Sequence, residues 1–231
     1  MTFEALQKTI SVTFADQELL KQAFIHRSYL NEARSIKESN ERLEFLGDAI
    51  LSFLTSQFLY KTYPLYPEGK LTNIRSSLVN TKSLGTASAS LSLGDLLFLS
   101  KGEQESGGRT NQSLLADCFE ALLGALYLDQ GIVAAQNFLE KHLFPNTEEI
   151  ISNKKYVDFK SHLQEVIQEK TRVSPTYVVI KSEGPDHAKT FWVEVRAEER
   201  LLGSGEGKSK QEAEQNAASD ALSALEKLSA S

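Results

Sequence analysis

Five carboxylate side chains stand at helical spacing in two separate stretches of the chain. Glu41, Glu44 and Asp48 occupy positions i, i+3 and i+7 of the segment NERLEFLGDA, so a helix would present them along one face. Asp117 and Glu120 stand three apart in a second, largely apolar stretch. Unpaired carboxylates are costly to bury on such a helix, and a hard cation bound by oxygen atoms would offset that cost. The chemistry that this pattern predicts is divalent-metal binding.

Magnesium suits such a site because it accepts two or three carboxylates and retains several waters. The chain has four histidines and one cysteine, and they do not cluster at the spacing of zinc ligands. Two alternatives remain open from the residues alone. The acids could pair with arginines or cap helices, and the acidic excess could be a solvated surface.

The elements that must position these acids are predicted to be helices over residues 1–145. Apolar residues recur three and four apart, and β-branched runs are few. Besides the helix of the first acidic segment, the pattern predicts one over residues 71–90 and a central, apolar one over 112–129. Gly131 is a plausible C-cap of the central helix, and residues 103–111 read as a polar, glycine-rich loop.

The pattern changes after a polar stretch, residues 146–157, which we interpret as a linker. Residues 158–228 predict a helix, three strands and a second helix that is rich in alanine. The expected fold class is therefore an all-α domain followed by a small α+β domain of α-β-β-β-α order. The predicted elements of the second domain are residues 158–170, 176–181, 191–196, 199–205 and 210–228.

Composition restricts the function classes. The net charge is −6, and residues 1–150 carry 13 Lys and Arg against 18 Asp and Glu. A polyanionic partner must therefore be met by local basic clusters or by metal ions. No apolar run approaches the ~20 residues of a membrane span, and no secretory signal is expected at the N-terminus. The single Cys118 allows no internal disulfide, and we expect a cytoplasmic protein.

Four ordered motifs carry a family resemblance. Residues 40–48, NERLEFLGD, resemble the signature of the ribonuclease III family without a departure. The segments HRSY (26–29), PEGKLT (67–72) and DCFEA (117–121) resemble further landmarks of that family in the same order. The arrangement of one nuclease domain (1–145) and one double-stranded RNA-binding domain (158–228) resembles the bacterial form.

This resemblance implies a metal-dependent endoribonuclease that hydrolyses phosphodiester bonds of double-stranded RNA. It implies products with 5′ phosphates and short 3′ overhangs, substrates among ribosomal RNA precursors and structured messages, and Mg²⁺, with Mn²⁺ able to substitute. No nucleotide cofactor is expected, because no phosphate-cradling loop is visible. Glu44 and Glu68 resemble the family's supporting acids, and Glu120 its most critical ligand. The catalytic and metal-ligating acids correspond to Glu41, Asp48, Asp117 and Glu120.

The family resemblance also implies a homodimer, with Phe45 at the subunit interface. A two-fold dimer would place one acidic site on each RNA strand. An ordinary core phenylalanine is the alternative for Phe45. For the whole chain, the alternative is a catalytically inactive protein that binds double-stranded RNA; such a chain would have lost one or more ligands, and all four are present.

The second domain resembles a double-stranded RNA-binding domain, which reads duplex shape, 2′-hydroxyls and phosphates. One departure is Gln211, which stands where the family usually has a basic residue, and it puts the strength of RNA binding in doubt. Glutamines four apart on the first helix, a histidine on a Gly-Pro turn and lysines at a helix N-terminus are the expected contacts. These residues are Gln164, Gln168, His187, Lys208 and Lys210.

Overall fold

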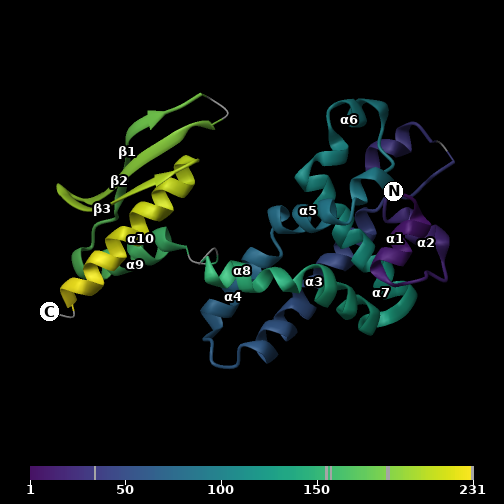
Figure 1. Ribbon diagram of the computed structural model, residues 1–231, viewed down its shortest axis with the longest axis horizontal. Helices are drawn as coiled ribbons and strands as arrows, with labels where there is room; N and C mark the ends of the chain where they lie inside the picture. The colour runs from purple at the N-terminus through teal and green to yellow at the C-terminus, as the bar shows by residue number, and fades with distance from the viewer. Residues whose placement is uncertain (34, 154–155, 157, 186–187, 230–231) are drawn as a thin grey trace. The chain divides into compact units, whose positions relative to one another are not determined.

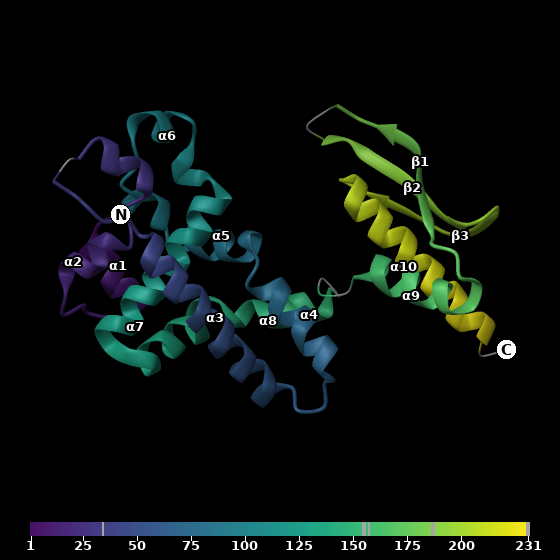
Figure 2. The same ribbon diagram turned by 180° about the vertical axis from the view of Figure 1, so that it is seen from behind.

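The computed structural model describes residues 1–33, 35–153, 156, 158–185 and 188–229. The chain forms two compact units, unit 1 (Met1–Tyr156) and unit 2 (Val157–Ser231). Unit 1 is helical, and unit 2 combines helices with a three-stranded sheet (Figures 1 and 2). The predicted fold class, an all-α domain followed by a small α-β-β-β-α domain, is confirmed.

Unit 1 is built around two long helices that cross each other, α3 and α7. Shorter α-helices and 3-10 turns surround them. The elements are α1 (Phe3–Ile10), α2 (Gln17–Gln22), η1 (Arg27–Asn31), α3 (Glu41–Thr62), α4 (Glu68–Leu78), α5 (Thr81–Ser90), η2 (Leu93–Leu96), α6 (Lys101–Glu105), η3 (Gly108–Thr110), α7 (Gln112–His142), η4 (Phe144–Asn146) and α8 (Thr147–Ser152).

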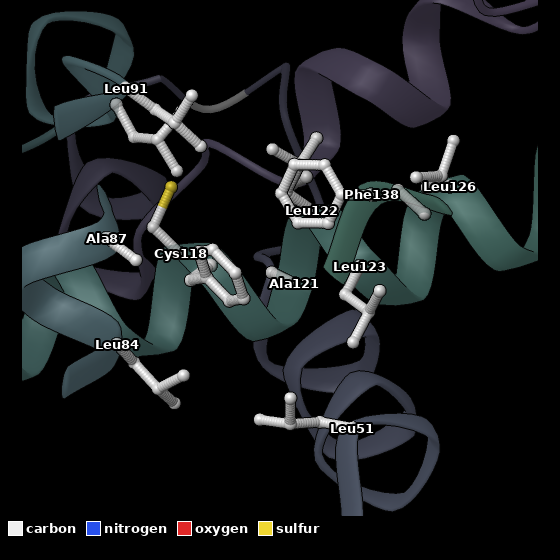
Figure 3. Packing of buried hydrophobic residues seen from close by; sticks show 14 of the residues in the cluster. Leu51, Leu84, Ala87, Leu91, Cys118, Ala121, Leu122, Leu123, Leu126 and Phe138 are labelled. Atoms are coloured by element: carbon white, nitrogen blue, oxygen red, sulfur yellow. The ribbon is translucent and has the colours of Figure 1, made fainter. Parts of the chain in front are cut away.

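Helix α7 runs through the middle of the unit 1 core. Its residues Phe119, Leu122, Leu123 and Leu126 are completely buried. Figure 3 shows neighbouring side chains from α3 and α5 closing around this helix. The apolar circumference noted in the sequence is therefore explained by neighbours on several sides.

Helix α7 is also long and apolar enough to cross a membrane by length and composition, alone among the helices of the described residues. Half of its most apolar stretch is buried inside unit 1, as is usual for the core helix of a globular domain. Gly131 interrupts its helical backbone with φ 82°. The predicted end of the central helix thus lies at a break, after which the chain resumes as helix.

The structure divides the helix expected over residues 71–90. Helix α4 ends at Leu78, and α5 begins at Thr81. The Asn80 side chain caps α5 by accepting from the Ser83 backbone N–H at 2.9 Å. Both halves bury apolar residues at helical spacing, so the sequence pattern alone could not show the break.

The stretch expected to be a linker, residues 146–157, contributes the short helix α8 to unit 1. Ile150 and Thr147 of α8 are buried, with exposed fractions of 6% and 1%. Helix α8 packs against α4 and η4. Burial of a few apolar side chains against these elements orders the first half of this stretch despite its polar composition.

Unit 2 is a three-stranded antiparallel sheet in the order β1-β2-β3 with its helices packed together. Val193 and Val195 of the central strand point into the core, opposite Val179 and Tyr177 of β1. The elements are α9 (Phe159–Thr171), β1 (Thr176–Glu183), β2 (Thr190–Ala197), β3 (Arg200–Gly207) and α10 (Lys210–Ser229).

Alternating glycines on β3 allow α10 to lie directly on the sheet. A Cβ at Gly205 would come within 2.2 Å of the Ala217 backbone nitrogen. The helix meets this surface with alanines at four-residue spacing, all completely buried. The contacting residues are Gly203, Gly205 and Gly207 on the strand and Ala213, Ala217 and Ala221 on the helix.

Candidate active site

The crossing of α3 and α7 brings the two acidic segments together. A Cβ at Gly47 of α3 would lie 1.8 Å from the Glu120 carbonyl oxygen, and a Cβ at Gly124 of α7 would lie 2.2 Å from the Leu43 carbonyl oxygen. The two backbones therefore touch, which only glycine permits at these positions. Carboxylates that flank this contact on both helices must share a small volume.

Three carboxylates form the closest group. Oxygen atoms of Glu44, Asp117 and Glu120 all lie within 4.8 Å of one another, and each side chain is half-buried. Such a group of carboxylate oxygens matches the ligands that Mg²⁺ and Mn²⁺ prefer. The residues of this group therefore fit a hard divalent cation.

The remaining α3 acids take two different positions. Asp48 stands one helical turn after Glu44 on α3, and its charge contributes to the raised pKa of Glu120. Glu41 has partners outside the group of three: its Oε2 accepts a hydrogen bond from Ser39 Oγ at 2.8 Å, and its Oε1 lies 3.7 Å from Arg27 Nη1. The structure thus gathers Glu44, expected to be a supporting acid, and holds Glu41, expected to be a ligand, at the rim.

Mutual repulsion and burial change the protonation of the group. Burial raises the pKa of Glu120 to about 7, and the charges of Asp48, Glu44 and Asp117 add to this shift. Burial, together with the neighbouring acids, also raises the pKa of Glu44. Burial raises the pKa of Asp117, although an interaction with His26 lowers it in part. A bound cation would relieve this repulsion.

Glu68, the other expected supporting acid, lies in the first turn of α4. Its side chain is exposed, and its Oε1 accepts from Thr72 Oγ1 at 2.9 Å within the same helix. It is absent from the group of three acids that the structure brings together. Its local contact explains its position without a cation.

The sequence motifs gave no role to His26, Arg27 and Ser39. These residues precede α3 and interact with its acids or with Asp117 of α7. The HRSY motif was the available signal, since it precedes the acidic helix by a short interval. Ser39 is nearly buried, with 9% of its surface exposed, and its hydroxyl fixes the Glu41 carboxylate.

Phe45 lies on α3 among the acids and is 81% exposed. The alternative that it is an ordinary core residue of the single chain is therefore wrong. In the single chain, Phe45 is therefore a large apolar side chain open to solvent on the helix that carries the acids.

In unit 2, four of the five predicted RNA contacts are exposed: Gln164 and Gln168 on α9, and Lys208 and Lys210 at the start of α10. Gln168 Nε2 donates to Ser174 Oγ at 3.0 Å. His187 lies outside the described residues.

Side chains accept hydrogen bonds from backbone N–H groups at the N-terminus of α10. The Glu212 backbone N–H donates to Ser209 Oγ at 3.1 Å, and the Glu212 carboxylate accepts from the Lys208 N–H at 2.7 Å. Side chains of the chain itself thus satisfy two backbone N–H groups near the start of this helix.

Comparison with known proteins agrees with this geometry. A family described as Ribonuclease-III-like matches residues 16–147, and the double-stranded RNA binding motif matches residues 159–225. Ribonuclease 3 of Enterococcus faecalis is 48% identical over 221 residues, covering 95% of this chain and 96% of that protein. Ribonuclease 3 of Bacillus licheniformis is 47% identical over 226 residues, covering 97% and 90%.

A solved structure extends the likeness to three dimensions. It is a ribonuclease III nuclease domain from Campylobacter jejuni, described for structural flexibility in its region involved in dimer formation. It is 35% identical, covers 63% of this chain and 98% of that chain, and superposes with a TM-score of 0.59. The motifs, the two folded units and these relatives lead to one conclusion: the chain belongs to the ribonuclease III family, in the form with a nuclease domain and a double-stranded RNA-binding domain.

Proposed function

We propose that this ribonuclease cuts both strands of duplex RNA with the help of Mg²⁺, or of Mn²⁺ in its place, held at the crossing of α3 and α7. The observation that carries the proposal is the group formed by Glu44, Asp117 and Glu120, whose oxygens lie within 4.8 Å of one another. Family membership supports the activity, and the oxygen-only ligand set supports the metal.

The geometry leads us to revise the ligand assignment. We assign Glu44, Asp117 and Glu120 as direct ligands and Asp48 as the adjoining fourth. Glu41, expected to be a ligand, is already bound to Ser39 and Arg27, so we assign it to orienting the rim of the site. Glu68 accepts a hydrogen bond from Thr72, so we assign it a supporting role in which it acts only through water or through contact with RNA.

The chain's own groups define what the site can do. Glu120 must lose its proton before it can bind a cation, and the metal-free carboxyl has a pKa of about 7. When bound, Mg²⁺ supplies activation of a water molecule and stabilisation of charge on the leaving oxygen.

Unit 2 supplies affinity for the duplex. We assign Gln164 and Gln168 to the minor groove and Lys208 and Lys210 to phosphates, with His187 as a further contact. Gln211 contributes no charge next to these lysines, so more of the attraction falls on Lys208 and Lys210.

A homodimer completes the proposal. Phe45 is 81% exposed on α3, beside the acids, and a two-fold axis near it would pair two sites across one duplex. Cleavage of each strand by one site would leave 5′ phosphates and short 3′ overhangs. In a bacterial-type cytoplasm, the substrates that we infer are ribosomal RNA precursors and structured messages.

The test is incubation of the full chain with a long RNA duplex in magnesium, beside a Glu120→Gln variant and an EDTA control. We expect short duplexes with 5′ phosphates from the unmodified chain alone, and retained binding by the variant. Tight binding without cleavage in magnesium or manganese would contradict the nuclease assignment.

A further inference from the structure

We propose that Arg27 is a substrate-binding residue whose guanidinium holds an RNA phosphate next to the one that is cut. The inference rests on the proposed function, because it requires duplex RNA at the acidic group. It gives a role to the HRSY segment and to an ion pair at the rim of the site.

The backbone around Arg27 is fixed by contacts with a distant segment. The His26 backbone N–H donates to the Phe98 carbonyl oxygen at 3.1 Å, and Ser28 Oγ accepts from the Ser100 N–H at 3.0 Å. The His26 ring also accepts from the Ser28 N–H at 3.3 Å. Arg27 is the first residue of η1, directly between these anchors. Its side chain therefore starts from a defined point beside α3.

The side chain itself is held loosely. Arg27 Nη1 lies 3.7 Å from Glu41 Oε1, which is longer than the ~2.7–2.9 Å of a charge-assisted hydrogen bond. The side chain is 72% exposed. A guanidinium has five N–H donors in a planar fork, and this single long contact leaves them available for a planar or tetrahedral anion.

The Glu41 carboxylate, itself fixed by Ser39, is the group that Arg27 contacts in the protein without RNA. Ser39 Oγ holds Glu41 Oε2 at 2.8 Å, which leaves Oε1 on the side of Arg27. Among the ion pairs of the described residues, this is the one that joins an arginine to an acid of the NERLEFLGD segment. Arg27 is thus pre-positioned at the rim by a weak contact that a phosphate can replace.

The charge of the site explains why such a residue is needed. Glu41, Glu44, Asp48, Asp117 and Glu120 lie close enough for several of them to raise one another's proton affinity. A polyanionic strand that approaches these acids is repelled. A cation bound by the ligands would offset this repulsion at the phosphate that is cut. The next phosphate along the strand would lie at the rim of the site, beyond that cation. An arginine there neutralises it and can bind it with two parallel hydrogen bonds.

A purely structural role would differ in a measurable way. If Arg27 only oriented Glu41, its removal would weaken metal binding and leave the salt dependence of RNA binding unchanged. If Arg27 binds phosphate, its removal lowers the number of counterions released when RNA binds, and the salt dependence becomes shallower.

The experiment measures duplex affinity as a function of salt in the full chain. The parent carries Glu120→Gln to prevent cleavage, and Arg27→Ala, Arg27→Lys and Lys8→Ala are added to it separately. Lys8 is an exposed lysine of α1 in the same unit, so Lys8→Ala controls for loss of one positive charge. Mn²⁺ binding without RNA is the second readout, measured on Arg27→Ala, Arg27→Lys and Lys8→Ala in the chain that keeps Glu120.

We expect Arg27→Ala to weaken binding about three- to tenfold at low salt and to reduce the slope of log K against log salt by about one for each Arg27 that reaches a phosphate. Arg27→Lys should keep the slope and lose less affinity, because it keeps the charge but not the fork. Mn²⁺ affinity should be unchanged in both.

Equal slopes for Arg27→Ala, Lys8→Ala and the parent would overturn the proposal while leaving the nuclease assignment intact. A loss of Mn²⁺ affinity with an unchanged slope would likewise overturn it, in favour of a role in orienting Glu41. A parent that does not bind duplex RNA would overturn the proposed function and this inference with it.

Discussion

Glu120 illustrates how one residue takes its chemistry from its place in the fold. Its pKa is raised to about 7 by burial and by three neighbouring carboxylates. The sequence predicted that Glu120 would be critical, yet the spacing of acids on α3 could not decide between Glu41 and Glu44. Both lie on the same helical face, and the ligand assignment that we propose depends on the contacts of Glu41 with Ser39 and Arg27, which precede the helix.

At the residue scale, Glu120→Gln should stabilise the metal-free protein at pH 8. The folded-state pKa is raised above the ordinary value of 4.5, so the charged form is disfavoured by folding. The free-energy cost of holding the charged Glu120 carboxylate in the folded protein is absent below about pH 4.5 and complete above about pH 7. Because Glu120 is partly exposed, solvent screening reduces this cost. We therefore expect Glu120→Gln to raise the free energy of unfolding by about 1–2 kcal/mol.

Thermal unfolding in EDTA at pH 8 and pH 5 measures this effect. We expect a rise of about 2–6 °C at pH 8 and a smaller one at pH 5. Glu105→Gln, at an exposed position on α6, is the matched control and should change neither value. A destabilised Glu120→Gln protein at pH 8 would show that the carboxylate is not under repulsion.

At the scale of elements, the site depends on how closely α3 and α7 cross. The helical spacing of apolar residues predicted both helices, and the DCFEA and NERLEFLGD segments predicted which parts carry the acids. The crossing point could not be predicted, because it is set by backbone contact at Gly47 and Gly124 rather than by a side-chain pattern. The end of α4 before Asn80 was missed for a similar reason, since one capping side chain decides it.

Gly47→Ala should separate the two helices. The added methyl would meet the Glu120 carbonyl oxygen, which is backbone and cannot move aside. We expect a loss of more than about 3 kcal/mol in the free energy of unfolding, measured by urea denaturation. Gly102→Ala on α6 is the control, because no atom lies within 4 Å of its added Cβ.

For that control, helix propensity predicts a gain of up to about 1 kcal/mol. If Gly47→Ala were as stable as Gly102→Ala, the helices would not be in backbone contact at Gly47.

At the scale of the whole molecule, the division into an all-α unit and an α-β-β-β-α unit followed from the change in hydrophobic period. The length of the segment between the two units could not be predicted from that change, because burial of Ile150 orders a stretch whose composition is polar. Self-association was implied by the family resemblance, with Phe45 at the subunit interface, and the exposure of Phe45 in the single chain agrees with that expectation.

Phe45→Asp should convert a dimer into a monomer. A charge at the centre of an apolar contact would be buried without a partner, which costs several kcal/mol. Sedimentation equilibrium of the full chain measures the mass. Leu65→Asp is the control, because Leu65 is 93% exposed yet lies outside α3. A wild-type protein that sediments as a monomer at micromolar concentration would refute the dimer.

The most direct test of the central claim is Mn²⁺ binding to the full chain, followed by electron paramagnetic resonance, with Glu44→Gln, Glu41→Gln and Glu105→Gln compared. We predict that Glu44→Gln weakens Mn²⁺ binding more than about 100-fold, that Glu41→Gln weakens it about tenfold, and that Glu105→Gln leaves it unchanged. Absence of Mn²⁺ binding by the unmodified chain, or a larger loss for Glu41→Gln than for Glu44→Gln, would contradict the assignment of the cation to the group formed by Glu44, Asp117 and Glu120.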